Sequence, residues 1–218
     1  MTPKRFRRLR QVLGRRQPDL TVLLENVHKP HNFAAVLRTA DAVGLFEAHA
    51  VIYETKLRTS LVSAGGSDKW IDVKLHNDIG QAIDHLRDRG FVLLGAHPGA
   101  RAIDYRQVDF TQPTALLLGQ EKDGLTPAAR EAVDDLISIP MTGFVDSLNV
   151  SVAAAVLLFE AHRQRSAAGM FENSRLAPEI YDQTLFEWAQ PRLADYCRRH
   201  DLPYPALDEN GQPIDPPP

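Results

Sequence analysis

The sequence is poor in cysteine and contains no long hydrophobic run. Cys197 is the only cysteine, so no disulfide can form within the chain and nothing suggests an oxidising compartment. No apolar stretch approaches the length of a membrane span, and residues 1–17 lack the apolar centre of a secretory signal. We therefore expect a cytoplasmic protein that makes no contact with a membrane.

Several familiar catalytic and nucleotide-binding motifs are also missing. The chain has neither the G-x-G-x-x-G of ordinary dinucleotide-binding folds nor the G-x-S-x-G of hydrolases. Residues 119–126, GQEKDGLT, have the glycine spacing of a Walker loop, but Leu125 stands where that loop needs lysine. His28 and His31 have no cysteine, histidine or carboxylate cluster near them, so we expect no metal site. A metabolic enzyme with a nucleotide cofactor is therefore disfavoured.

The charge is small overall but unevenly distributed. The formal net charge is −3, which argues against a general nucleic-acid coat. Basic residues nevertheless gather near both ends, in residues 162–175 and 192–200 and in a run before the first acidic residue, Asp19. That run comprises Lys4, Arg5, Arg7, Arg8, Arg10, Arg15 and Arg16. Such ends predict contacts with the phosphates of a polyanion, although solvated helix faces would give the same pattern.

The middle of the chain alternates short apolar strands with amphipathic helices, which is typical of an α/β fold with a mostly parallel sheet and helices on both faces. We expect strands at 21–27, 48–54, 70–76, 91–98, 113–121 and 135–141. Helices are expected at 4–16, 31–44, 78–90, 126–134, 143–161 and 178–200. The predicted organisation is a basic helical extension (1–19), one α/β domain (20–165), a helical extension (166–207) and a disordered Pro-rich tail (208–218).

Unusual polar residues follow the carboxyl ends of four expected strands, where open α/β sheets bind ligands. They are Asn32, His97, the segment 119–121 and the segment 146–149. The last contains Asp146, Ser147 and Asn149 at the start of an apolar helix, and a helix needs only one cap. From this stretch alone, capping and ligand binding both remain open. Arg38 lies off the apolar stripe of helix 31–44 and faces solvent or a cleft.

Three stretches, read in order, resemble the motifs of the SPOUT RNA methyltransferases. They are HNFAAVLRTADAVG (31–44), LLLGQEKDGL (116–125) and IPMTGFVDSLNVSVAAAVLLFEA (139–161). The basic N-terminal helix and the helical C-terminal tail narrow the resemblance to the TrmH-type branch. That branch methylates the ribose 2′-hydroxyl of guanosine 18 in the D-loop of tRNA. The resemblance implies a homodimer, a tRNA partner, and a deep C-terminal trefoil knot that binds S-adenosylmethionine.

The resemblance also assigns roles to particular positions. Backbone groups of four residues would hold the cofactor: His97, Gly119, Ile139 and Leu148. Five side chains would line the reaction site: Asn32, Arg38, Glu121, Ser147 and Asn149. Six arginines would bind tRNA phosphates: Arg7, Arg8, Arg10, Arg163, Arg165 and Arg175. One position departs from many relatives, because Ala34 stands where they have glycine.

The resemblance makes Arg38 the general base for the ribose hydroxyl. A guanidinium stays protonated in proteins, however, which favours an alternative. In that alternative Arg38 binds the neighbouring phosphate and stabilises the developing alkoxide, with Asn32 orienting it, and the proton leaves through water or Glu121. Two rival functions are kept open, namely a SPOUT enzyme acting on ribosomal RNA and an RNA-binding protein without catalysis.

Overall fold

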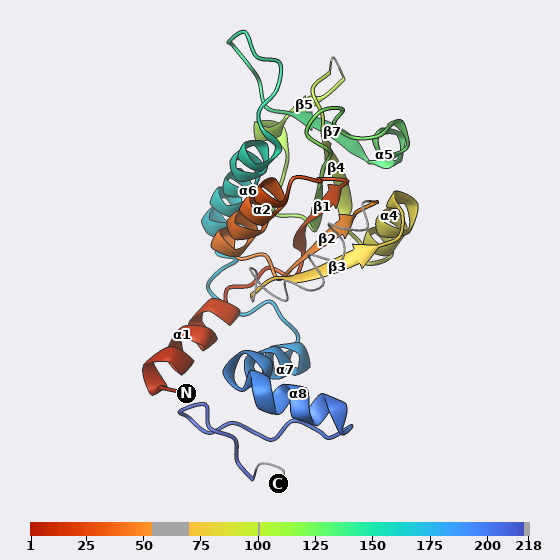
Figure 1. Ribbon diagram of the computed structural model, residues 1–218. Coiled ribbons are helices and arrows are strands. Elements are labelled where there is room, and N and C mark those ends of the chain that lie inside the picture. The colour runs from red at the N-terminus through yellow and green to blue at the C-terminus, as the bar shows by residue number, and fades with distance from the viewer. Residues whose placement is uncertain (54–69, 100, 216–218) are drawn as a thin grey trace. The chain divides into compact units, whose positions relative to one another are not determined.

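The computed structural model describes residues 1–53, 70–99 and 101–215 (Figure 1). The chain divides into two compact units. The first, Pro18–Gly169, contains the sheet and is called the sheet unit below. The second, called the terminal unit, combines Met1–Gln17 with Met170–Pro218. The two ends of the chain, which the sequence presented as separate extensions, therefore belong to the same unit.

The sheet unit is built on seven parallel strands in the order β3-β2-β1-β6-β4-β7-β5. Their bounds are β1 (Leu20–Glu25), β2 (Glu47–Val51), β3 (Asp72–His76), β4 (Val92–Ala96), β5 (Ile103–Asp104), β6 (Thr114–Leu118) and β7 (Asp135–Ser138). The parallel α/β architecture is confirmed. Six strands were predicted, and β5 has only two residues, too few for a periodicity. Residue 54 of the expected strand 48–54 lies outside the described residues.

Helices cover both faces of this sheet. Helices α2 (Pro30–Val43) and α6 (Val150–Ala167) lie side by side on one face, and α4 (Ile79–Asp88) and α5 (Pro127–Ala132) lie on the other (Figure 1). A single 3-10 turn, η1 (Tyr105–Gln107), follows β5. Every residue of β1, β2 and β6 is buried, as expected for strands covered on both faces.

At the centre of the sheet, the connections that leave two neighbouring strands run to opposite faces. Strands β1 and β6 are neighbours, with Leu23 paired to Leu117. The helix that follows β1 covers one face, whereas α5, which follows β6, covers the opposite face. Divergence of this kind opens a crevice beyond the carboxyl ends of the two strands, where α/β proteins bind ligands.

Helix α6 begins at Val150, seven residues later than the sequence analysis predicted. The Asn149 side chain accepts a hydrogen bond from Ser151 N at 2.9 Å, so Asn149 is the N-cap. The residues before it form a loop that projects beyond the sheet in Figure 1. Helix α6 is also not buried all round within one chain, because Val152 is 47% and Phe159 53% exposed.

The terminal unit contains α1 (Pro3–Leu13), α7 (Pro178–Ala189) and α8 (Pro191–Arg199). The predicted continuous helix 178–200 is interrupted because Pro191 cannot continue the hydrogen bonding of α7.

The segment 208–215 was predicted to be disordered, but Asp208 Oδ1 accepts hydrogen bonds from two backbone N–H groups and Gln190 Nε2 donates to Gly211 O at 2.7 Å. Residues 216–218 lie outside the described residues.

None of the helices in the described part of the chain is both long enough and apolar enough to cross a membrane.

Candidate functional site

Three segments that are far apart in the sequence meet through their polar side chains. Asn149 Nδ2 donates to Asn32 Oδ1 at 3.2 Å, and Asn32 Nδ2 donates to Glu121 Oε1 at 2.8 Å. Asn32 is only 2% exposed, so the amide is held between its two partners. The structure thus brings together three of the five side chains that the resemblance assigned to the reaction site.

Glu121 also contacts two residues of the segment between β1 and α2. Its Oε1 also accepts a hydrogen bond from Lys29 N at 3.2 Å, and its Oε2 lies 3.2 Å from His28 Nδ1. Burial raises the pKa of Glu121, but the hydrogen bonds from Asn32 and from backbone N–H groups, together with His28, outweigh it. The pKa therefore lies below the ordinary value, and Glu121 is a carboxylate at neutral pH.

The loop that carries Glu121 is folded tightly on itself. Gln120 and Gly124 pair through two backbone hydrogen bonds of 3.1 and 3.0 Å. A Cβ atom at Gly119 would lie 2.1 Å from the carbonyl carbon of Gly124, and Gly124 itself has a φ of 68°. Glycine is required at both positions for this closure. The glycines singled out in the sequence therefore shape the loop on which Glu121 stands.

Two residues that the sequence analysis missed hold this loop to the end of β1. Glu25 is 1% exposed, and its carboxylate accepts from Thr126 N at 2.9 Å and from Thr126 Oγ1 at 2.6 Å. Asn26 Nδ2 donates to Gln120 Oε1 at 3.3 Å. A carboxylate ending an apolar strand is the one signal in the sequence that could have marked Glu25, because such a group needs partners when buried.

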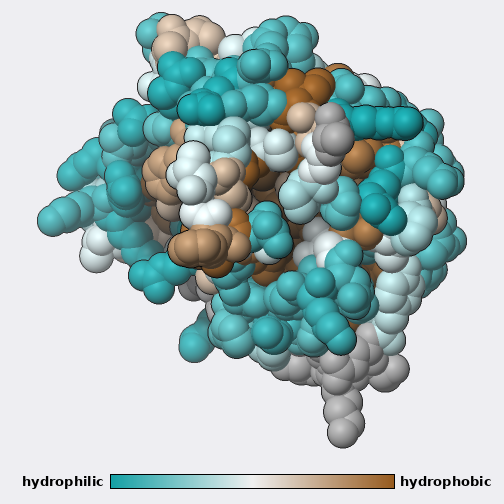
Figure 2. Space-filling view, turned by 90° about the horizontal axis from the view of Figure 1, so that it is seen from above, coloured by the Kyte–Doolittle hydropathy of each residue, from teal (hydrophilic) through white to brown (hydrophobic). Residues whose placement is uncertain are grey.

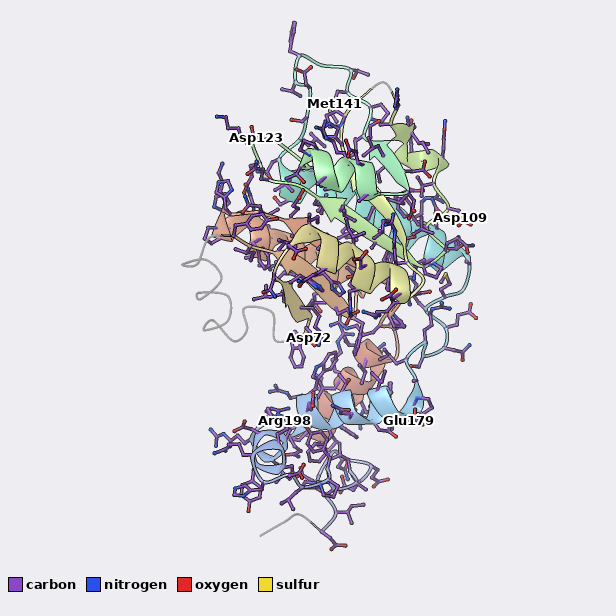
Figure 3. All side chains as sticks on the ribbon, turned by 90° about the vertical axis from the view of Figure 1, so that its right-hand side faces the viewer. Asp72, Asp109, Asp123, Met141, Glu179 and Arg198 are labelled. Atoms are coloured by element: carbon purple, nitrogen blue, oxygen red, sulfur yellow. The ribbon has the colours of Figure 1, made fainter. Side chains whose placement is uncertain are left out.

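A cavity of about 250 Å³ opens at the carboxyl ends of β4, β6 and β7. All four residues expected to hold the cofactor line it, namely His97, Gly119, Ile139 and Leu148, and so does Ser147. Seen from above, apolar surface lies in the hollowed centre of this end, surrounded by hydrophilic side chains (Figure 2). Asp123 and Met141, which also line the cavity, lie at this end of the sheet in Figure 3, and Asp72 at the start of β3 lies away from it.

His97 has a second partner at the cavity wall. Its Nε2 lies 3.3 Å from Arg130 Nη1, which can only donate a hydrogen bond, so the lone pair of His97 faces the guanidinium. Burial and the charge of Arg130 lower the pKa of His97. His97 therefore lines the cavity as a neutral ring, and its acceptor nitrogen is already paired with Arg130.

Arg38 lies on α2, and its side chain is exposed. No hydrogen bond or ion pair joins it to another residue in the described part of the chain. The expectation that Asn32 orients Arg38 stays a prediction, since the Asn32 amide is bonded to Glu121 and Asn149 in this structure and not to Arg38. At the start of α6, Asn149 both caps the helix and contacts the network, so the two readings left open by the sequence hold together for this residue.

The arginines expected to bind RNA differ in exposure. Five of them have exposed side chains: Arg7, Arg8, Arg10, Arg163 and Arg175. Arg165 is fully buried, donates to Asp19 Oδ1 at 2.6 Å, and also donates to the carbonyl oxygens of Asp19, Phe110 and Gln112. Its assignment to RNA binding is wrong. A guanidinium with these partners links α6 to the start of β1 instead. The helical spacing in the sequence does not reveal that Arg165 is buried.

Among residues 1–53, 70–99 and 101–215, no group of three or more histidine, cysteine or acidic side chains is arranged to hold a metal ion.

Comparison with known proteins places these features in a family. Residues 19–159 match the model of the SpoU rRNA Methylase family, and residues 163–216 match the model described as SpoU, rRNA methylase, C-terminal. The tRNA (guanosine(18)-2′-O)-methyltransferase of Escherichia coli K12 is 49% identical over 214 residues, which cover 97% of this chain and 93% of that protein.

Two solved structures show the same relationship in three dimensions. The TrmH/SpoU tRNA modifying enzyme of A. aeolicus has a TM-score of 0.77 at 38% identity, covering 85% of this chain and 94% of that one. The SpoU methyltransferase AviRb of Streptomyces viridochromogenes, in complex with the cofactor AdoMet, has a TM-score of 0.60 at 33% identity, covering 69% of this chain and 60% of that one. On both sequence and structure, the chain belongs to the SpoU rRNA methylase family.

Proposed function

We propose that this protein transfers a methyl group from S-adenosylmethionine to the ribose 2′-hydroxyl of guanosine 18 in tRNA. The observation that carries the proposal is the hydrogen-bonded network of Asn32, Glu121 and Asn149 beside the cavity at the carboxyl ends of the strands. The choice of tRNA rests on the match to the E. coli enzyme, which extends over 97% of this chain, including both terminal segments.

The cavity suits S-adenosylmethionine by its chemistry. Its walls are mostly apolar, as an adenine ring requires, and the Gly119–Gly124 closure brings backbone groups to its edge. Backbone atoms of His97, Gly119, Ile139 and Leu148 would hold the cofactor. When bound there, the cofactor supplies an electrophilic methyl group on a sulfonium. The deep knot implied by the resemblance stays part of this proposal.

In the proposed reaction Arg38 is a binding group rather than a base. A guanidinium keeps its proton, and five N–H donors match a phosphate in a bidentate manner. Because the Arg38 side chain is exposed, it is accessible to the phosphate beside the target ribose. Ser147, which is exposed at the cavity, would contact substrate or cofactor. The network of Asn32, Glu121 and Asn149 would fix the geometry around the ribose.

The exposed arginines account for tRNA affinity in this proposal. Arg7, Arg8 and Arg10 lie on α1 of the terminal unit, and Arg163 and Arg175 lie in and after α6. Contacts of this kind go to phosphates, give little sequence choice, and weaken as salt concentration rises. The target guanosine must leave its stacked position before its ribose reaches the network.

We further propose that the enzyme is a homodimer that uses the exposed apolar side of α6. Val152 and Phe159 on that helix, with Phe144 and Val145 in the preceding loop, expose large hydrophobic side chains. Side chains of this size are usually buried in an interface. The cytoplasmic location predicted from the sequence remains a prediction.

Mass spectrometry of tRNA tests the function. Unmodified tRNA and ribosomal RNA are each incubated with the protein and isotopically labelled S-adenosylmethionine, and the labelled nucleoside is mapped. We expect label on the ribose of guanosine 18. We also expect Arg38→Lys to lose nearly all turnover, because lysine cannot reproduce a bidentate phosphate contact. Label in ribosomal RNA alone would contradict the tRNA assignment. Binding of S-adenosylmethionine and tRNA without any transfer would point to a non-catalytic RNA-binding protein.

A further inference from the structure

His28 lies beside the network, although the sequence analysis considered it only as a metal ligand. It follows β1 and precedes α2. Its Nδ1 lies 3.2 Å from Glu121 Oε2 and 3.4 Å from Asn26 O. Oε2 is buried and accepts no well-aligned hydrogen bond from the described residues, so a small rotation of the imidazole would pair the two groups. The His28 side chain is 41% exposed, against 9% for Glu121, so the ring remains accessible from solvent.

These contacts decide which ring nitrogen carries the proton. Both atoms that face Nδ1, a carboxylate oxygen and a carbonyl oxygen, can only accept a hydrogen bond. Nδ1 therefore carries the proton in the neutral ring, and the lone pair lies on Nε2. A histidine held in this way by a carboxylate has the arrangement that general bases use in nucleophilic catalysis.

The other candidate bases at the site are worse placed. Burial raises the pKa of Glu121, but its hydrogen bonds lower the pKa by a larger amount. The net pKa lies below the ordinary value, so the carboxylate is a weak base. Arg38 is a permanently charged guanidinium. The lone pair of His97 faces Arg130. Only His28, among these four, has an acceptor nitrogen, Nε2, that forms no hydrogen bond with a described residue, because its partners face Nδ1.

We propose that His28 is the general base of the reaction and that Glu121 orients it. This inference rests on the proposed function. As the ribose oxygen bonds to the methyl carbon and the carbon–sulfur bond breaks, leaving its electron pair on sulfur, Nε2 accepts the hydroxyl proton. The resulting imidazolium is balanced by the Glu121 carboxylate and then releases the proton to solvent. Asn32 and Lys29 N, by binding Oε1, direct Oε2 toward His28.

The kinetic test uses His28→Asn, which keeps an N–H donor near the Nδ1 position but has no basic nitrogen. The matched control is His31→Asn, because His31 is exposed on the same segment and has no role in the network. Single-turnover methyl transfer is measured on the full-length protein with saturating tRNA and S-adenosylmethionine. We expect the His28 variant to lose about 10²–10⁴-fold in rate, the range for removing a general base, while the His31 variant keeps the wild-type rate.

Two binding measurements separate catalysis from substrate binding. Calorimetry with S-adenosylmethionine and filter binding with tRNA should give wild-type affinities for His28→Asn. Adding Glu121→Gln to His28→Asn should lower the rate of methyl transfer little further than His28→Asn by itself, because the two residues act as one unit. A wild-type rate in His28→Asn, an equal loss in His31→Asn, or a loss of tRNA affinity large enough to explain the rate would each overturn the proposal.

A spectroscopic measurement needs no substrate. In the wild-type protein, ¹⁵N chemical shifts of the His28 ring should report the proton on Nδ1, and Glu121→Ala should shift the ring toward a mixture of tautomers. A proton on Nε2 in the wild type would refute the assignment. If the wild-type protein methylates no RNA, the proposed function fails by itself. If it methylates guanosine 18 while His28→Asn is fully active, only the role of His28 fails.

Discussion

At the residue scale, several side chains serve more than one purpose, which a sequence pattern does not show. Asn149 caps α6 through its Oδ1 and contacts Asn32 through its Nδ2, so capping and participation in the site are compatible. Glu25 closes an apolar strand and also holds the loop that carries Glu121. These double roles depend on partners 101 and 117 residues away in sequence, at Thr126 and Asn32, which only the folded chain brings close.

A glycine substitution tests whether the tight loop matters for the cofactor. In Gly119→Ala the new Cβ atom would lie 2.1 Å from the Gly124 carbonyl carbon, so the loop must open. We expect S-adenosylmethionine affinity, measured by calorimetry, to fall at least about tenfold, or about 1.4 kcal/mol. The control is Gly99→Ala, whose Cβ would meet no atom within 4 Å. Equal affinity in the two variants would show that the loop does not shape the cofactor site.

At the element scale, β2, β3 and α4 bring three histidines together. His49 is fully buried, its Nδ1 lies 2.9 Å from His76 Nε2, and the His85 ring centroid is 5.4 Å from both other rings. Glu47, which contacts Arg89, lies beside His49. Burial and then the charges of His49 and His85 lower the pKa of His76 to about 4, although Asp78 and Glu47 oppose the shift. His76 therefore resists protonation, and burial also lowers the pKa of His85.

Acid should weaken the sheet unit through this cluster. The pKa of His76 is lowered from 6.5 to about 4 by folding. Between these two pH values the imidazole is mostly protonated in the unfolded chain but mostly neutral in the folded protein. Stability must fall as pH drops through this window. Glu47, whose pKa is lowered to about 2, loses its stabilising effect only below its ordinary 4.5, so it does not explain a loss above that pH. We expect His76→Gln to reduce the difference in urea stability between about pH 7 and about pH 5. An unchanged difference would assign the effect elsewhere.

At the scale of the whole molecule, the exposed apolar side of α6 predicts self-association. We expect the wild-type protein to be a dimer by light scattering and Phe159→Asp to be a monomer, because a carboxylate cannot be buried in an apolar interface without a partner. Ile180→Asp is the control, since Ile180 is similarly exposed, at 46% against 53%, but belongs to the terminal unit. A monomeric wild type, or a dimeric Phe159 variant, would contradict the proposed interface.

The sequence by itself determined the alternation of strands and helices, the parallel sheet, the strand ends that carry polar residues, and the three motifs that indicate the family. Periodicity, caps and glycines are local, so local patterns predict them. The tertiary structure decided which polar residues share a partner. Arg165 reads as a surface arginine on a basic stretch but is buried on Asp19, and His28 reads as an isolated histidine but faces Glu121. A side chain's role follows from what surrounds it, and those neighbours come from distant segments that no local pattern connects.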